Sequence, residues 1–182
     1  MPEKIVIVGA GMAGLWSAIA LAREDREIVV LDRDPPPPEG GAEAAFEHWN
    51  RRGVGHLRHS HAFLARLRTL VRDQHPKLHE ALLAAGCREL GFEGTLSARH
   101  KEAYVPKPID RDLAILTSRR TTLELEMRRY AEGLGGVTLR PETFVKELII
   151  QPGAPPRVTG VRLEDGTELA AEIVVDAAGR NS

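Results

Sequence analysis

Three glycines at short, regular spacing are the residues of this chain with the clearest chemical meaning. The segment Gly9-Ala10-Gly11-Met12-Ala13-Gly14 is a complete G-x-G-x-x-G pattern. In such a pattern the first glycine permits a tight turn, the second lets the backbone approach a pyrophosphate, and the third lets a helix pack closely on a strand. A helix that begins here also offers free N–H groups and the positive end of its dipole to phosphates. The spacing therefore predicts a diphosphate-binding loop.

The elements that flank these glycines decide how specific the pattern is. Ile5–Val8 is a β-branched run typical of a strand buried in a parallel sheet, and residues 12–23 are rich in alanine and leucine, which favours a helix. A second apolar run, Ile28–Leu31, ends in Asp32. An acid close to the expected spacing of about 20 residues accepts hydrogen bonds from the ribose of an adenosine. Together these features predict a β-α-β dinucleotide-binding unit, without indicating which dinucleotide.

Composition places the chain among ordinary globular proteins. Its 182 residues include 25 basic and 26 acidic side chains, with 42% hydrophobic and 28% charged residues. These values exclude a disordered tail, a fibrous repeat and a disulfide scaffold. The near-neutral charge argues against nucleic acid as a partner. Cys87 is the single cysteine, so no internal disulfide can form, and we expect a buried thiol in a reducing, cytoplasmic compartment.

An uncharged stretch near the N-terminus resembles a membrane span or a signal peptide in its length and composition. Residues 5–22 carry no charge over 18 positions, which is the lower limit for a membrane span. The three glycines would weaken a continuous helix, and Glu3 offsets the charge of Lys4 where a signal peptide is clearly basic. We therefore expect a strand, a turn and a helix here, and no integral membrane span.

Charge is distributed unevenly in the second quarter of the chain. From His48 to Arg72 there are six arginines, four of the seven histidines and no acid. Two interpretations stay open, a solvated helix face with a loop or a local anion site. His56, His59 and His61 lie within six positions, yet no carboxylate or cysteine is near and Arg58 would repel a cation, so we expect no metal.

The remaining pattern predicts a change from helices to strands along the chain. The segment from Pro35 to Gly41 is a loop, and residues 42–55 show no periodicity. Expected helices are residues 63–71 with Ser60 as N-cap, 77–85 ending at Gly86, and 121–132. Expected strands are residues 104–105, 113–116, 137–139, 144–150, 158–163, 168–171 and 173–175, with a hairpin turn at Asp165-Gly166.

The order of these motifs resembles the flavoprotein monooxygenases. It combines G-x-G-x-x-G, Asp32-Arg33, the Arg-x-x-Leu-Glu of residues 120–124, the hairpin and the terminal Val-Val-Asp-Ala-Ala-Gly-Arg. Within these enzymes the chain looks most like the group near geranylgeranyl reductases, squalene epoxidases and flavin-dependent halogenases. Residues 52–61 are similar to an Arg-x-Gly-Val-Pro-Gln-x-x-His-x-His segment of bacterial members, with Gly55 and His56 in place of Pro and Gln. The absence of a Trp-x-Trp-x-Ile-Pro segment disfavours a halogenase.

The resemblance implies an α/β fold, a three-layer Rossmann-like domain with a parallel sheet, helices and an antiparallel hairpin or meander. Residues 1–182 would form the FAD-binding domain at the front of a longer enzyme, with residues 88–117 as an excursion into the substrate domain. Gly9, Gly11 and Gly14, with Ala10, Met12 and Ala13 between them, would hold the pyrophosphate and Asp32 the ribose. The other cofactor-binding residues that the resemblance implies are Arg33 and Val145 near adenine, Arg58 and His59 in the basic segment, Arg120 or, by a one-residue shift, Arg119 toward the flavin, and Ala178 and Gly179 beside the FAD. For the two arginines a charged helix end is the structural alternative.

The activity that the resemblance implies comes from the cofactor. FAD carries hydride and oxygen chemistry, while the protein supplies orientation and electrostatics. We expect an FAD-dependent monooxygenase that acts on a small organic or lipid-like substrate, with NAD(P)H as a possible electron donor, and we nominate no catalytic residue. The alternatives are an NAD(P)-dependent dehydrogenase and a truncated, non-catalytic nucleotide-binding module. The sequence leaves the substrate, the choice between NADH and NADPH and the oligomeric state undetermined.

Overall fold

The computed structural model describes residues 1–179, and the chain divides into two compact units. The first unit consists of Met1–Pro38, His48–Gly55 and Met127–Ser182, and the second consists of Glu39–Glu47 and His56–Glu126. Arg180, the last residue of the terminal motif, lies outside the described residues.

A parallel sheet forms the centre of the first unit. Its strand order is β10-β1-β2-β6, and all three pairings are parallel. The strands are β1 (Glu3–Val8), β2 (Arg26–Leu31), β6 (Val137–Arg140) and β10 (Ile173–Asp176). Central strands β1 and β2 bury Ile5, Ile7 and Ile28 almost completely, as a strand covered on both faces requires. The two apolar runs of the sequence are thus neighbours in the sheet.

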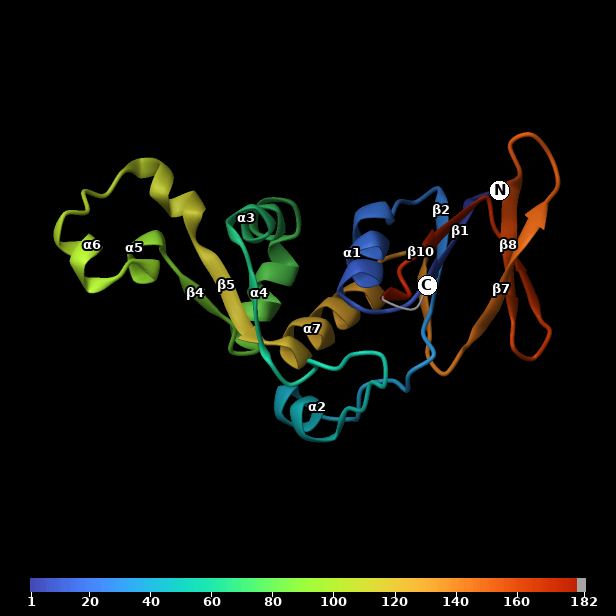
Figure 1. Cartoon of the computed structure of the whole chain (residues 1–182), viewed down its shortest axis with the longest axis horizontal. Coiled ribbons are helices and arrows are strands. Elements are labelled where there is room, and N and C mark those ends of the chain that lie inside the picture. The colour runs from blue at the N-terminus through green and yellow to red at the C-terminus, as the bar shows by residue number, and fades with distance from the viewer. Residues whose placement is uncertain (180–182) are drawn as a thin grey trace. The chain divides into compact units, whose positions relative to one another are not determined.

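Two different layers cover this sheet. The helix α1 (Met12–Leu21) buries Leu15, Ala18 and Ile19. An antiparallel meander of β7 (Val145–Gln151), β8 (Arg157–Leu163) and β9 (Glu168–Ala170) packs Val161 and Leu163 against Val6 and Leu31. In Figure 1, α1 and the meander lie on opposite sides of β1, β2 and β10. This is the expected three-layer α/β arrangement, which confirms the predicted fold class.

The second unit is built on a small antiparallel sheet with short helices. Its strand order is β3-β5-β4, formed by β3 (Ser60–Phe63), β5 (Ile115–Arg119) and β4 (Arg88–Leu90). The helices of this region are α2 (Ala42–His48), α3 (Ala65–Gln74), α4 (Pro76–Ala84), α5 (Phe92–Thr95), α6 (Ala98–Glu102) and the 3-10 helix η1 (Pro108–Leu113). The helix α7 (Arg120–Glu132) contributes residues to both units.

Several local expectations differ from this structure. Ser60 begins the strand β3 instead of capping a helix, because Ser60–Phe63 pairs with Leu116–Arg119 of β5, and α3 begins only at Ala65. The pair Tyr104-Val105 forms no strand. The helix α2 occupies part of a segment without periodicity, which the pattern therefore missed. By contrast, the hairpin at Asp165-Gly166 is present, and the positive φ of Gly166 (+88°) is the reason for a glycine there.

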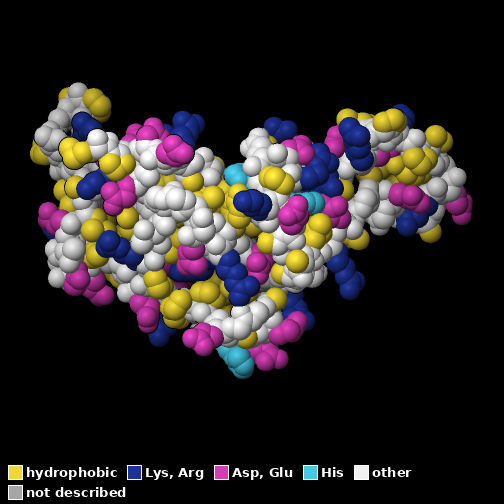
Figure 2. Space-filling view, turned by 180° about the vertical axis from the view of Figure 1, so that it is seen from behind, with side chains coloured by type: hydrophobic (Ala, Val, Ile, Leu, Met, Phe, Trp, Pro, Cys, Tyr) yellow, Lys and Arg dark blue, Asp and Glu magenta, His cyan; other side chains and the backbone are white. Residues whose placement is uncertain are grey.

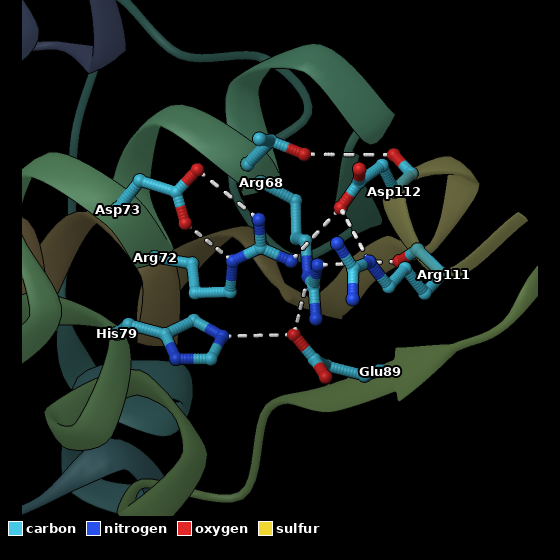
Figure 3. A network of polar contacts seen from close by, with 8 residues as sticks. Arg68, Arg72, Asp73, His79, Glu89, Arg111 and Asp112 are labelled. Carbon is cyan, nitrogen blue, oxygen red and sulfur yellow. Dashed lines mark hydrogen bonds and ion pairs between the residues drawn. The ribbon is translucent and has the colours of Figure 1, made fainter. Parts of the chain in front are cut away.

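A network of ion pairs ties the elements of the second unit together (Figure 3). Arg68 on α3 lies 2.5 Å from the carboxylate of Glu89 on β4, which also accepts from His79 on α4 at 2.8 Å. Arg72 contacts Asp73 at 2.5 Å and Asp112 of η1 at 3.2 Å. Each arginine that is labelled in the network has at least one carboxylate within 4.0 Å. We therefore interpret it as a structural clamp between α3, α4, β4 and η1.

Charges of both signs are interspersed on the face of the molecule shown in Figure 2. The dark blue and magenta side chains alternate there, and neither sign gathers into one extended patch. Within residues 1–179, no helix combines the length and the apolar character that crossing a membrane requires. The uncharged stretch of residues 5–22 is divided between β1, the glycine turn and α1.

Replacing Glu89 by glutamine tests the clamp. The Arg68 guanidinium holds the pKa of Glu89 at about 2, well below its ordinary value of 4.5. This lowered pKa means that the stabilisation is complete above about pH 4.5 and is lost as the pH falls through about 2. We expect Glu89→Gln to lower the free energy of unfolding by about 1–2 kcal/mol at pH 7, because buried Arg68 loses its counter-ion.

Denaturant unfolding at pH 7 and at pH 2.5 measures this difference. The matched control is Glu80→Gln, on the exposed face of α4, which should change the free energy by less than about 0.5 kcal/mol. Equal effects of the two variants, or a Glu89→Gln effect that does not shrink toward pH 2.5, would show that the clamp does not stabilise the unit.

Candidate dinucleotide-binding site

Two of the three glycines are required by the packing of the chain itself. Gly9 follows β1 with a φ of +100°, and a Cβ there would lie 2.5 Å from the carbonyl oxygen of Ala177. A Cβ at Gly14, in the first turn of α1, would overlap the carbonyl oxygen of Gly9. These contacts let α1 start directly against the ends of β1 and β10. The turn therefore places the first N–H groups of α1 at the carboxyl edge of the sheet.

Gly11 has a different reason for being a glycine. It is the N-cap of α1, with an ordinary φ of −81°, and a Cβ there would meet no atom of the protein within 4 Å. No side chain caps this helix end, and its first turn contains no acidic residue. Neither backbone strain nor packing explains the missing side chain, whereas a diphosphate lying against the backbone does. The loop from Gly9 to Gly14 thus fits the diphosphate of a dinucleotide.

Asp32 lies directly after β2 and is almost fully buried, with 4% of its surface exposed. Its Oδ2 atom is 2.5 Å from Nη2 of Arg51, and its Oδ1 atom accepts the backbone N–H of Asp34 at 3.1 Å. Arg51 also donates from Nη1 to the carbonyl oxygen of Ala10, inside the glycine loop, at 3.1 Å. One guanidinium therefore connects the strand-end acid to the diphosphate loop.

Two further ions complete this buried cluster. The carboxylate of Asp34 lies 3.5 Å from Nε of Arg51, and Nη1 of Arg128 on α7 lies 3.9 Å from Oδ2 of Asp32. All four side chains are at least 95% buried. Burial raises the pKa of the Asp32 carboxyl, and the Arg51 guanidinium offsets part of that rise. Two carboxylates here face two guanidinium groups, and Arg128 also lies 3.6 Å from Glu132, so each buried ion has a group of opposite charge nearby.

This cluster occupies part of the carboxylate that Asp32 would offer to a ribose. A carboxylate offers about four lone-pair positions, and Arg51 and Asp34 use at least two of those of Asp32. Ribose hydroxyls must therefore share the carboxylate with Arg51 or displace it. The assignment of Asp32 to the ribose stays a prediction. Arg51 was missed as part of this site, although its place in an acid-free segment signalled that its partners lie elsewhere in the chain.

A cavity of about 610 Å³ opens beside these residues in the first unit. Backbone hydrogen bonds from Glu142 and Thr143 to the carbonyl oxygens of Asp34 and Asp32 bring the start of β7 next to the end of β2. The lining residues are Arg33, Asp34, Pro35, Asn50, Arg52, Glu142, Phe144 and Glu164. Arg33, predicted near adenine, thus shares a cavity with Phe144, the neighbour of Val145. A Cβ at Gly53 would lie 2.6 Å from Nη2 of Arg33, so this glycine leaves room for the guanidinium.

The turn after β10 also reaches the glycine loop. The N–H of Ala177 donates to the carbonyl oxygen of Val8 at 2.8 Å, and Ala178 donates to the side chain of Asp176 at 3.0 Å. Gly179 has a φ of +83°, a conformation that favours glycine. The structure therefore brings Ala178 next to Gly9.

The predicted cofactor residues of the basic segment belong to the second unit. Arg58 donates to the carbonyl oxygens of Phe46 and Glu47 at 2.9 and 3.0 Å. Arg120 begins α7, and its backbone N–H donates to the carbonyl oxygen of His59 at 3.0 Å. Arg119, considered as a substitute for Arg120, is paired with Glu43 at 2.8 Å. Arg58, His59 and Arg120 stay predictions as cofactor residues.

Removing the guanidinium of Arg51 tests the buried cluster. We expect Arg51→Met to lower the free energy of unfolding by about 3–5 kcal/mol, because Asp32 and Asp34 remain buried without their main counter-ion. The loss should diminish as the pH falls, because the raised pKa of Asp32 lets this buried carboxyl take up a proton and lose its need for a counter-ion. The neighbouring Arg52→Met, at an exposed position, is the control and should change stability by less than about 0.5 kcal/mol. Similar unfolding free energies for both variants, measured in urea, would contradict the proposed importance of Arg51.

Comparison with known proteins gives relatives in sequence and in structure. Over 91 residues the chain is 33% identical to D-amino acid dehydrogenase 2 of Ralstonia nicotianae, a match that covers 47% of this chain and 21% of that protein. It superposes on PqsL of Pseudomonas aeruginosa, described as a probable FAD-dependent monooxygenase, with a TM-score of 0.63 and 18% identity, covering 96% of this chain and 42% of PqsL. CtdE in complex with FAD gives a TM-score of 0.63 and 18% identity, covering 100% of this chain and 39% of CtdE.

The solved structures show the fold, and the family model shows the family. The two solved structures, at 18% identity, share the fold, and this chain spans about two fifths of each. Residues 4–182, nearly the whole chain, match the family described as FAD dependent oxidoreductase. The glycine loop, the strand-end acid and the three-layer fold are thus those of a flavoprotein, and the chain belongs to the FAD-dependent oxidoreductase family.

Proposed function

We propose that the first unit holds the adenosine diphosphate part of FAD and that the chain belongs to a flavoprotein monooxygenase acting on a small organic or lipid-like substrate. The observation that carries this proposal is the backbone cradle at Gly11, where a Cβ would meet nothing of the protein although the glycines on either side are tightly packed. The family match supports FAD as the dinucleotide.

The chain's own residues have distinct tasks in this proposal. The N–H groups at the start of α1 bind the diphosphate, and Asp32 accepts hydrogen bonds from the ribose. The adenine ring lies in the cavity between Arg33 and Phe144, where a guanidinium plane and an aromatic ring offer flat surfaces for stacking. FAD, once bound, supplies hydride transfer and reaction with oxygen. Ala178 and Gly179, small residues beside the glycine loop, let the cofactor pass close to the backbone.

Two kinds of substrate oxidation are compatible with this cofactor. The fold shared with PqsL supports a monooxygenase, for which NAD(P)H is the electron donor we propose. The 33% identity to D-amino acid dehydrogenase 2 favours a second candidate, direct oxidation of an amine substrate by the flavin. Mixing the FAD-loaded chain anaerobically with NADH, NADPH or a panel of D-amino acids separates the two. Bleaching of the flavin by a D-amino acid, and by neither nicotinamide, would replace the monooxygenase proposal with the dehydrogenase.

The colour of the purified chain tests the cofactor itself. A yellow chain that releases FAD on denaturation supports the proposal and argues against an NAD(P)-dependent dehydrogenase. A colourless chain that binds NADH at micromolar concentration and fails to bind added FAD would overturn it. Flavin binding without reduction by any donor would favour the non-catalytic nucleotide-binding module.

Two alanine substitutions in the same loop separate ligand binding from folding. Gly11→Ala places a methyl group in the cradle without touching the protein, so we expect an unchanged unfolding free energy and an FAD dissociation constant raised at least tenfold, about 1.4 kcal/mol. Gly14→Ala forces a Cβ onto the carbonyl oxygen of Gly9, so the FAD-free chain itself should be destabilised, by about 1–3 kcal/mol.

The measurements are chemical denaturation without FAD and titration of FAD by fluorescence quenching. Wild-type affinity in Gly11→Ala would place the diphosphate elsewhere. An unaltered stability of Gly14→Ala would contradict the close approach of α1 to the β1 turn.

A further inference from the structure

A buried arginine of the second unit connects a carboxylate and a histidine. Arg120, at the start of α7, is 9% exposed. Its Nε donates to Glu124 at 2.7 Å, and the Glu124 residue is completely buried. Its Nη1 contacts Nε2 of the exposed His56. The Arg120 side chain thus links a buried carboxylate to an imidazole at the surface.

The contact between Arg120 and His56 fixes where the imidazole carries its proton. A guanidinium has only donors and keeps its charge at all ordinary pH values. Nε2 of His56 must therefore be the nitrogen with the free lone pair, and the proton sits on Nδ1. His56 is neutral in this arrangement, and the nearby Arg120 charge lowers its pKa, with smaller contributions in the same direction from burial, His61 and His59.

An arginine and two further histidines surround the His56 ring. The ring of His61 stacks on that of His56 with centroids 5.4 Å apart, and His59 stands edge-on at 6.5 Å. The Glu124 carboxylate also acts on His56, and it is paired with Arg120. Among residues 1–179, no group of three metal-binding side chains is present. A ligand for this cluster would therefore be an anion.

We propose that His56 and Arg120 form a proton-linked binding site for an oxyanion, a carboxylate or a phosphate. When His56 takes up a proton, its Nε2 becomes a donor and can no longer accept from Arg120. Two donors with positive charge then face each other, and an oxyanion between them accepts from both. Each anion bound is accompanied by one proton taken up from solvent.

Inorganic sulfate tests this site because it keeps its charge throughout the range in which histidine titrates. The full chain without flavin is titrated from pH 8 to pH 5 at constant ionic strength set with sodium chloride, and the His56 ring is followed by NMR. We expect sulfate to raise the apparent pKa of His56. By reciprocity, the affinity for sulfate should increase about tenfold per pH unit between the apparent pKa values of the free and the sulfate-bound chain.

Two histidine variants give the matched comparison. His56→Gln retains an acceptor for Arg120 but cannot take up a proton, so its sulfate affinity should lose this pH dependence. His100→Gln removes an exposed imidazole of α6 that lies against Ser97 and is not part of the cluster, and it should keep the linkage. An unchanged His56 pKa in sulfate, or the same pH dependence in His56→Gln as in the wild-type chain, would overturn the proposal.

A final arm identifies the source of the oxyanion. If FAD itself raises the pKa of His56 and removes the response to sulfate, the oxyanion is the diphosphate of the cofactor. If the FAD-loaded chain still responds to sulfate, the site serves a separate anionic ligand, and both results support the linkage. The inference does not rest on the proposed function, because its residues all belong to the second unit and the sulfate experiment contains no flavin. A chain that binds FAD but shows no sulfate linkage would contradict this inference alone.

Discussion

The predicted cofactor site depends most on one buried guanidinium, that of Arg51. It contacts the carbonyl oxygen of Ala10 at 3.1 Å, Asp32 at 2.5 Å and Asp34 at 3.5 Å. These contacts join the glycine loop, the end of β2 and the segment that contains Arg51. Because buried carboxylates are costly without a counter-ion, removal of the arginine should rearrange Asp32, the acid predicted to contact the ribose. The contacts of Arg51 therefore stabilise the first unit and fix the geometry of the predicted site at the same time.

The glycine loop shows how structural and ligand constraints can be separated within six residues. Gly9 and Gly14 are explained by the chain itself, through contacts with Ala177 and with each other. Gly11 is not, because its φ is ordinary and the space next to its Cα is free of protein atoms. A sequence pattern treats the three positions alike. The structure assigns two of them to close packing and leaves Gly11, whose missing side chain the contacts of the protein do not explain and the proposed diphosphate would.

The sequence pattern predicted the elements that are buried in a regular way, such as the central strands of the parallel sheet. Ile5–Val8 and Ile28–Leu31 are buried on both faces in the centre of the parallel sheet, and a continuous apolar run indicates this. Ser60 was misassigned because its polar side chain fits a helix cap as well as an edge strand, and only the pairing with Arg119 decides. The cofactor motif was legible because it is local. The ion pairs of Arg51, Arg68 and Arg72 were not, because most of their partners lie 19 to 40 positions away.

The acid-free segment from His48 to Arg72 contains arginines that are ion-paired within the fold and a separate cluster of histidines. Arg51, Arg68 and Arg72 are neutralised by acids from other segments, so they stabilise the fold and contribute little net charge. The His56 ring contacts Arg120, the rings of His59 and His61 lie against that of His56, and Arg120 pairs with the carboxylate of Glu124. The ion pairs of those three arginines argue against a local anion site at their positions, because their charge is already compensated within the fold. At His56 and Arg120 the anion site is the proposal that the sulfate titration tests.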